Sequence, residues 1–142
     1  MMTPDQTSKA FDQARTERLA VARKFAIEAA RSLDDNQCSD TIVLDLRGRS
    51  PVADLLVISS GTSDRQMKSA AEDVEDLAPQ SDHALVRRAA DDRHTWIVSD
   101  FGDVVIHIFE PETRAFYDLE LLWGDADRIP WKRDAAPRTA ES

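Results

Sequence analysis

Acidic side chains are the most abundant charged groups of this sequence, and several lie close enough together to suggest a metal site. Phosphoryl and nucleotidyl transfer commonly use two acids one residue apart on a strand, because both carboxylates then point to one face and can hold magnesium. Asp45 stands alone in its segment, and Asp100 and Asp103 lie three residues apart across an expected turn. The adjacent acids at 34–35 and 91–92 are typical of solvated loops. The spacing therefore predicts no metal site and no transferase centre.

Nucleophilic groups are few, and they lack the neighbours that catalysis needs. A serine or cysteine nucleophile requires a histidine and an orienting acid within reach. The single cysteine, Cys38, lies in a polar loop, and the positions of His83, His94 and His107 are typical of structural or surface histidines rather than of ligands. We therefore predict that the protein is not an enzyme and uses no cofactor.

The connection between an expected strand and an expected helix at residues 61–66 is a candidate anion site. Backbone amides at the start of a helix attract anions, and Gly61, Thr62 and Ser63 stand at such a start. However, the segment lacks the lysine and the glycine spacing of a phosphate-binding loop. Ser63 with Gln66 three residues later also forms a capping-box pattern. A helix cap accounts for these residues without a ligand, and we favour it.

The charge balance restricts the kinds of partner. Lys and Arg number 18 against 27 Asp and Glu, which gives a formal net charge of -9. Because nucleic-acid affinity comes largely from cationic side chains, we do not expect direct binding of RNA or DNA over a broad face. The negative charge favours a basic protein partner. A second interpretation, in which the charge serves only to keep the domain soluble, fits the composition equally well.

Localisation signals are not apparent in the sequence. No stretch approaches the roughly twenty apolar residues of a membrane helix. Residues 1–13 are polar and resemble neither a signal peptide nor a transit peptide. We therefore expect a cytoplasmic protein that makes no membrane contact.

Hydrophobic periodicity divides the chain into elements that would position these groups. Apolar residues at three- and four-residue spacing predict helices over 16–33 and 63–77. β-rich runs predict strands over 41–46 and 55–59, a weaker strand over 83–86, and an antiparallel hairpin of 95–99 with 104–109. A turn or short helix is expected over 113–123.

This element order favours an α/β fold in which helices cover a mixed β-sheet. The predicted domain spans residues 16–123. Residues 1–15 and 124–142 lack periodic apolar residues and are expected to be flexible tails, with 129–131 as the one segment of the second tail that could be ordered.

Large aromatic residues gather in the last third of the chain and alternate with acids. The aromatic residues are Trp96, Phe101, Phe109, Phe116, Tyr117 and Trp123. Two interpretations remain open from the residues alone. The aromatic groups form a core with a solvated acidic rim, or some of them face outwards as interface anchors for a basic partner, since Trp and Tyr dominate binding hot spots.

Three segments resemble the signatures of the ribosomal silencing factor (Iojap) family. Residues 54–66 (DLLVISSGTSDRQ) resemble the first signature, residues 96–109 (WIVSDFGDVVIHIF) the second, and residues 114–123 (RAFYDLELLW) the third. The resemblance implies a nucleotidyltransferase-like α/β fold without the catalytic residues. It also implies a translational repressor that binds the large ribosomal subunit through its protein number fourteen and blocks association with the small subunit.

Alternatives of different classes remain beside this interpretation. Organellar relatives are linked to assembly of the large subunit, so an assembly factor is the main alternative. A nucleotide-dependent transferase of the same fold is a weaker one, and a homodimer is possible. Within the silencing interpretation, we assign partner contacts to six residues: Trp96 and Tyr117 as apolar anchors, Asp100 and Asp103 as partners for Lys or Arg, and Glu120 and Trp123 as further contacts.

Overall fold

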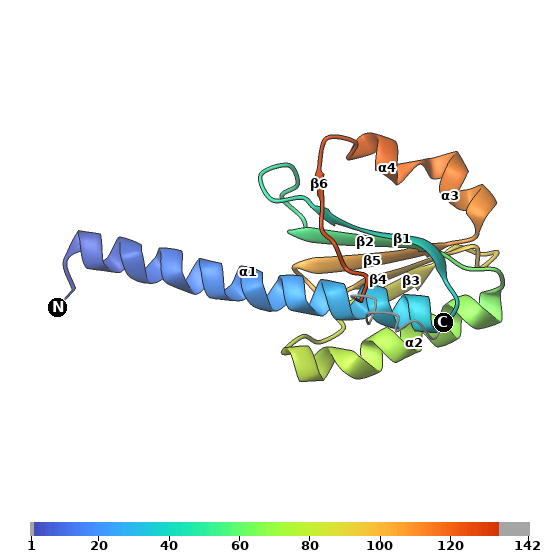
Figure 1. Cartoon of the computed structure of the whole chain (residues 1–142), viewed down its shortest axis with the longest axis horizontal. Helices are drawn as coiled ribbons and strands as arrows, with labels where there is room; N and C mark the ends of the chain where they lie inside the picture. The colour runs from blue at the N-terminus through green and yellow to red at the C-terminus, as the bar shows by residue number, and fades with distance from the viewer. Residues whose placement is uncertain (1, 134–142) are drawn as a thin grey trace, which may run out of the picture.

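The first helix, α1 (Pro4–Asp35), is much longer than its apolar periodicity predicts. The structure is a computed structural model, which describes residues 2–133. The side chain of Thr3 accepts a hydrogen bond from the backbone of Gln6, and the Gln6 side chain accepts one from the backbone of Thr3. This capping box starts the helix at Pro4 and not at residue 16, so residues 4–15 are helical where the sequence predicted a flexible tail over 1–15. The first half protrudes from the body (Figure 1), and its side chains are almost all exposed, which is consistent with its lack of an apolar stripe.

A six-stranded mixed sheet forms the centre of the molecule and confirms the predicted fold class. Its strands are β1 (Ser39–Asp45), β2 (Leu55–Ser60), β3 (Arg87–Ala90), β4 (Trp96–Asp100), β5 (Val104–Phe109) and β6 (Asp127–Arg128). The spatial order is β3-β4-β5-β2-β1-β6. Strands β2 and β5 pair in parallel, whereas the other neighbours are antiparallel. The weak strand expected over 83–86 lies instead at 87–90, as β3.

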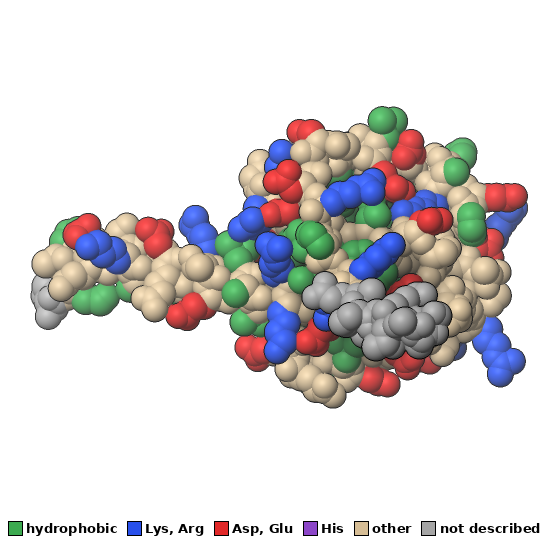
Figure 2. Space-filling view, viewed as in Figure 1, with side chains coloured by type: hydrophobic (Ala, Val, Ile, Leu, Met, Phe, Trp, Pro, Cys, Tyr) green, Lys and Arg blue, Asp and Glu red, His purple; other side chains and the backbone are tan. Residues whose placement is uncertain are grey.

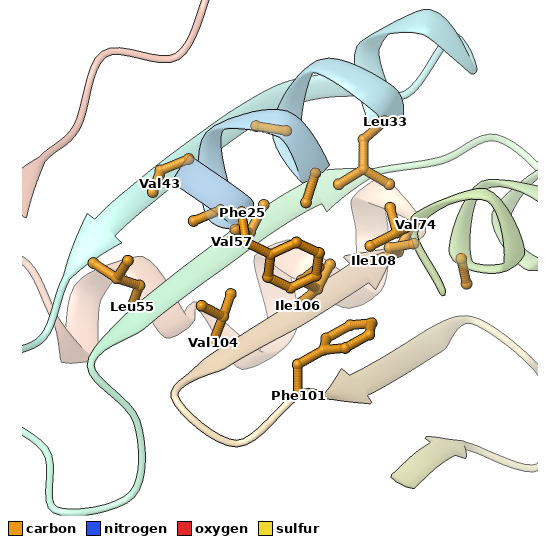
Figure 3. Packing of buried hydrophobic residues seen from close by; sticks show 14 of the residues in the cluster. Phe25, Leu33, Val43, Leu55, Val57, Val74, Phe101, Val104, Ile106 and Ile108 are labelled. Carbon is orange, nitrogen blue, oxygen red and sulfur yellow. The ribbon is translucent and has the colours of Figure 1, made fainter. Parts of the chain in front are cut away.

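One face of the sheet is covered by α1 and by α2 (Asp64–Leu77), which is followed by the short 3-10 helix η1 (Ala78–Ser81). The second half of α1 contributes small residues and two large ones, Phe25 and Leu33, and these pack on strand residues such as Val57 and Ile106 (Figure 3). All four of these side chains are almost fully buried. The main core therefore lies between these two helices and the sheet.

The opposite face of the sheet carries a second, smaller cluster. Its buried members are Leu44, Leu46, Leu56, Ile58 and Phe109. Two short helices, α3 (Pro111–Tyr117) and α4 (Leu119–Leu122), lie on this side (Figure 1). Neither helix has a buried residue, so this face is only partly covered.

The segment after α4 packs on the domain, where the sequence predicted a flexible tail from residue 124 with 129–131 as the one segment that could be ordered. Strand β6 pairs with β1, and Ile129 donates a backbone hydrogen bond to Val43. Trp131 is only 8% exposed, and its Nε1 donates to the carbonyl of Thr41 over 2.9 Å. These contacts hold residues up to Trp131 in the fold, and the rest of the expected tail, 134–142, lies outside the described residues. Among residues 2–133, no helix is long and apolar enough to cross a membrane.

Candidate protein-docking surface

Trp96 is the centre of an aromatic group on the partly covered face of the sheet. It starts β4 opposite Phe109, the last residue of β5, and the two rings stack with centroids 4.9 Å apart. Tyr117, at the end of α3, also contacts the indole, with ring centroids 4.6 Å apart. The indole Nε1 donates to Nδ1 of His107 over 3.0 Å. Trp96 is therefore fixed in place by stacking and by a hydrogen bond while it stays half-buried.

His107 is held neutral beneath this group. Burial lowers the pKa of His107 from 6.5 to about 4, because the charged imidazole would lose its hydration. A neutral ring has one nitrogen free to accept, which is what the Trp96 indole requires. The pKa shift and the hydrogen bond are therefore consistent with each other.

Large apolar side chains of α3 and α4 are exposed beside the aromatic group. Phe116 is 80% exposed, Tyr117 50%, Leu121 77% and Leu122 67%. Single exposed apolar residues are ordinary, but four within seven consecutive positions form a patch, and patches of this kind mark interaction sites. We call Trp96, Phe116, Tyr117, Leu121 and Leu122 the apolar surface.

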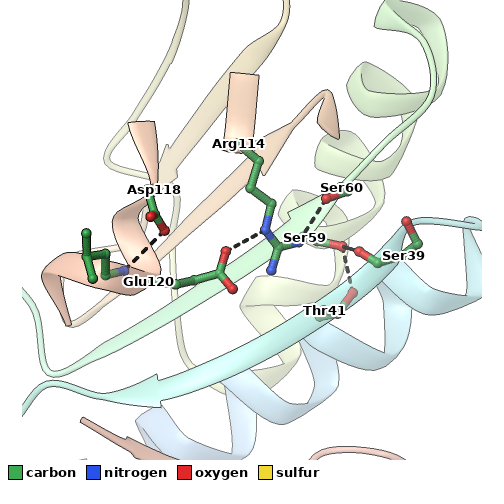
Figure 4. Close-up of polar contacts among 8 residues, drawn as sticks. Ser39, Thr41, Ser59, Ser60, Arg114, Asp118 and Glu120 are labelled. Atoms are coloured by element: carbon green, nitrogen blue, oxygen red, sulfur yellow. Dashed lines mark hydrogen bonds and ion pairs between the residues drawn. The ribbon is translucent and has the colours of Figure 1, made fainter. Parts of the chain in front are cut away.

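An arginine holds the two short helices over the sheet (Figure 4). Nε of Arg114 donates to Glu120 over 2.8 Å, and Nη1 donates to Oγ of Ser60, the last residue of β2, over 2.8 Å. Between the helices, Asp118 has a left-handed backbone with φ of +46°, and its side chain accepts a hydrogen bond from the backbone of Leu121. Glu120 therefore has an internal partner, which the sequence prediction of a contact residue did not include.

The six predicted contact residues divide into two groups in space. Trp96 and Tyr117 touch each other, Glu120 belongs to the Arg114 contact, and Trp123 packs on the small cluster of the same face. Asp100 and Asp103 lie at the opposite end of the β4–β5 hairpin. Their interface role stays a prediction, and the structure shows what else they do.

Both turn acids have bonding partners within the chain. Asp100 accepts a hydrogen bond from the backbone of Gly102, which has φ of +91° and thus a backbone suited to glycine. Asp103 lies 2.8 Å from Nε2 of His83. The two acids therefore shape the hairpin turn and attach it to the segment after η1.

The other groups that could do chemistry have structural roles. Burial raises the pKa of the Cys38 thiol to about 11, so the reactive thiolate is disfavoured. Ser63 caps α2 through the backbone of Gln66, and a Cβ on Gly61 would stand 2.3 Å from Cγ of Met67. Within residues 2–133, no three His, Cys, Asp or Glu side chains are grouped to hold a metal ion.

Sequence reasoning missed Leu121, Leu122 and Arg114 as contributors to this site. The two leucines fit a short amphipathic helix, where they would be assigned to the core, and only the fold shows that they face away from the sheet. Arg114 carries no signal for its partner, because Ser60 lies 54 positions earlier in the chain.

Comparison with known proteins places the chain among related sequences. A family model described as "Ribosomal silencing factor during starvation" matches residues 20–142. The ribosomal silencing factor of Bacillus subtilis is 39% identical over 98 residues, which cover 69% of this chain and 83% of that protein. A mouse protein named mitochondrial assembly of ribosomal large subunit protein 1 is 33% identical over 108 residues, 72% of this chain and 47% of its own length.

A solved structure supports the same relationship at the level of the fold. The crystal structure of a protein from Chromobacterium violaceum superposes with a TM-score of 0.68 and 28% sequence identity. The superposition covers 82% of this chain and 96% of that one. The similarity therefore extends over the sheet and its helices and is not limited to one motif.

Proposed function

The chain belongs to the ribosomal silencing factor family, and on that premise we propose that it represses translation by binding the large ribosomal subunit. The contact that we propose is with the subunit's protein number fourteen. Docking there obstructs association with the small subunit, so repression requires the protein to occupy space and requires no bond to be made or broken. We place this activity in the cytoplasm.

The observation that carries the proposal is the apolar surface. Trp96 and Tyr117 provide rigid aromatic groups of the kind that dominate interface energies, and Phe116, Leu121 and Leu122 extend them. Exposing this much apolar area on a free protein is unfavourable, and a partner that covers it regains the hydrophobic free energy. Trp123 and Glu120 anchor the edge of the same surface in our proposal.

The charge of the chain supports a basic partner. The net charge is -9, and opposite potentials accelerate the encounter of two proteins. Glu112 and Asp118 lie on or beside α3 and α4 and add negative charge close to the apolar side chains in the sequence, whereas Glu120 is paired with Arg114. An apolar centre with an acidic rim is complementary to a basic protein surface.

The decisive experiment replaces exposed leucines of α4 by serine. Leu121→Ser with Leu122→Ser removes apolar area without opening the core, because both side chains are exposed. The matched control is Val52→Ser with Val86→Ser, which are 77% and 68% exposed elsewhere. Wild type and control should co-sediment with large subunits and not with small subunits, and should inhibit subunit joining. The leucine variant should lose both properties by about tenfold or more.

Several results would contradict this proposal. Equal sedimentation of the wild type with both subunits, or with neither, contradicts specific docking. If the leucine variant binds large subunits as well as the control does, the apolar surface is not part of the contact with the subunit. A change in oligomeric state with unchanged subunit binding assigns the surface to a second copy of the chain instead.

Assembly of the large subunit is the second candidate function, and the name of the mouse relative favours it. Both functions use the same docking surface, so the leucine variant does not separate them. Cells that lack the protein distinguish the two functions. If the protein is a silencing factor, these cells contain mature large subunits that join small subunits too readily. If it is an assembly factor, they contain precursor particles that sediment more slowly than mature large subunits.

A further inference from the structure

Positive charge is concentrated on one short part of α1. Between residues 15 and 24 the chain carries Arg15, Arg18, Arg23 and Lys24 against one acid, Glu17. The whole chain has the reverse balance, with 18 basic and 27 acidic residues. Figure 2 shows basic side chains gathered where the protruding helix meets the body. This is a local exception on an acidic protein.

A hollow of about 650 Å³ lies at this junction. Arg15 and Arg18 line it from α1, and Arg47 lines it from the loop after β1. Asp54 and Asp103 also line it, so three guanidinium groups face two carboxylates. An adjoining hollow shares Arg47 and adds Arg23. Segments far apart in the sequence therefore bring several arginines to one place.

The pairing of these side chains shows which charges are available. Arg47 binds Asp45 through two nitrogens, and this pairing lowers the pKa of Asp45 and raises that of Arg47. Asp103 is bound to His83. Arg15 and Arg18 are exposed and have no hydrogen-bond or ion-pair partner among residues 2–133. The hollow thus presents two free guanidinium groups one helical turn apart.

We propose that this hollow, which we call the arginine site, binds phosphate groups of the large subunit's RNA backbone when the protein is docked. This inference rests on the proposed function. The planar guanidinium fork matches two phosphate oxygens, and the arginines carry their charge at any physiological pH. A contact limited to a few phosphates agrees with the acidic chain, because broad binding needs basic side chains over a whole face.

The distribution of charge indicates which side of the domain faces the RNA. Helix α2 carries five acids, Asp64, Glu72, Asp73, Glu75 and Asp76, against Arg65 and Lys68, so RNA is repelled from that side. The arginine site adjoins the Asp103 end of the β4–β5 hairpin, and Trp96 lies at the other end. One side of the domain therefore meets protein and another meets RNA, and the two contacts together would fix its orientation on the subunit.

The test compares two charge-matched double variants. Arg15→Gln with Arg18→Gln removes the free arginines, and Arg65→Gln with Lys68→Gln removes two exposed basic residues at the same spacing on α2. Binding to purified large subunits is measured from about 50 to about 200 mM salt. Each lost phosphate contact lowers the slope of log affinity against log salt by about 0.7–0.9, so the α1 variant should lose about 1.4–1.8 and the α2 variant nothing. The ratio of the wild type's affinity for large subunits to that of the α1 variant should then fall about tenfold from the lowest to the highest salt concentration.

A second probe separates RNA from protein as the source of the contact. Both variants should bind isolated protein number fourteen as the wild type does. The arginine site is overturned if the two variants have equal slopes of log affinity against log salt. It is also overturned if the α1 variant loses as much affinity for the isolated protein number fourteen as it loses for the large subunit. Saturable binding of a free mononucleotide that the α1 variant loses would assign the hollow to a small ligand and also overturn the RNA contact.

Failure of the proposed function would be visible separately. If the wild type bound no subunit at all, the docking proposal would fail, and the arginine site would be judged on purified large-subunit RNA at low salt. There the α1 variant should bind more weakly than the α2 variant, and equal retention of the two variants would overturn the site. Thermal midpoints of both variants should match the wild type, because all four side chains are exposed.

Discussion

Nε2 of His83 lies 2.8 Å from Oδ1 of Asp103, and this bond joins the segment after η1 to the turn of the β4–β5 hairpin. The other ring nitrogen, Nδ1, lies 2.6 Å from the carbonyl oxygen of Ser81. The ring therefore lies between two oxygen partners, one on each side of the imidazole. The ring also stacks on Phe25 at 4.5 Å. Asp103 thus has a structural role next to the arginine site.

Asp103→Asn tests the sign of the charge that the hollow prefers. An asparagine oxygen still accepts from His83, so the free energy of unfolding should fall by less than about 1 kcal/mol. Removing a negative charge beside Arg15 and Arg18 should strengthen binding to large subunits at low salt by about two- to fivefold. Asp92→Asn, an exposed loop residue, is the control. If Asp103 instead meets a basic group of the partner, as the sequence predicted, binding weakens.

The sequence predicted the elements that carry their own signals. Helix α2 begins after Ser63, where the cap was expected, and the hairpin of β4 with β5 turns at Gly102. Those features depend on residues close together in the chain. The start of α1 also depends on neighbouring residues, Thr3 and Gln6, but the first half of this helix has no apolar periodicity from which to predict it. The docking of Trp131 depends on Thr41, 90 positions away.

The candidate site was predicted to a similar extent. Trp96 and Tyr117 were identified by residue type, and the fold brings them together. Asp100 and Asp103 were grouped with them because they follow Trp96 closely in sequence, but five strand residues carry the chain to the other end of the hairpin. Residue type indicated what could bind, and only the topology showed which residues share a face.

Two substitutions at Glu120 separate positioning from direct contact. Glu120→Ala leaves the largely buried Arg114 guanidinium without its carboxylate, which should cost about 1–3 kcal/mol of stability and should weaken subunit binding, because α4 is no longer held. Glu120→Gln keeps an acceptor for Arg114 and should restore most of both. Urea unfolding and subunit sedimentation measure the two effects. A glutamine variant that is stable but fails to bind would show that the carboxylate itself touches the partner.

Trp131 should be one of the most costly residues to truncate, and it lies in the one segment of the expected tail, 129–131, that the sequence left open as ordered. Trp131→Ala removes a buried side chain and should lower the free energy of unfolding by about 3–5 kcal/mol. Trp131→Phe keeps most of the apolar area but loses the bond to Thr41, at a cost of about 1–2 kcal/mol. Deleting residues 1–14 should change stability little by comparison, because residues 2–14 are almost entirely exposed. Urea unfolding of all three proteins checks the order, and an alanine variant as stable as the wild type would contradict the observed packing.

His107 should make the stability of the domain depend on pH. Its pKa is about 4 in the folded chain and about 6.5 when exposed, so between these values the unfolded chain takes up a proton that the folded chain refuses. The stabilisation that His107 contributes is therefore complete above about pH 6.5 and is lost as the pH falls towards 4. Between pH 7.5 and 4.5 the wild type should lose about 2 kcal/mol on this account.

The matched variant for this prediction is His107→Asn, which keeps an acceptor for the Trp96 indole but does not titrate. Acidic residues whose pKa is lowered, such as Asp45, are present in both proteins, so their contribution cancels in the comparison. Urea unfolding at pH 7.5, 6.0 and 4.5 should show a steeper decline for the wild type than for the variant. Because pH 4.5 is still above the folded-state pKa of about 4, most folded molecules keep His107 neutral, and subunit binding by the wild type should change no more than that of the variant. Parallel declines in stability would mean that solvent reaches the imidazole and that its pKa is not lowered in the folded chain.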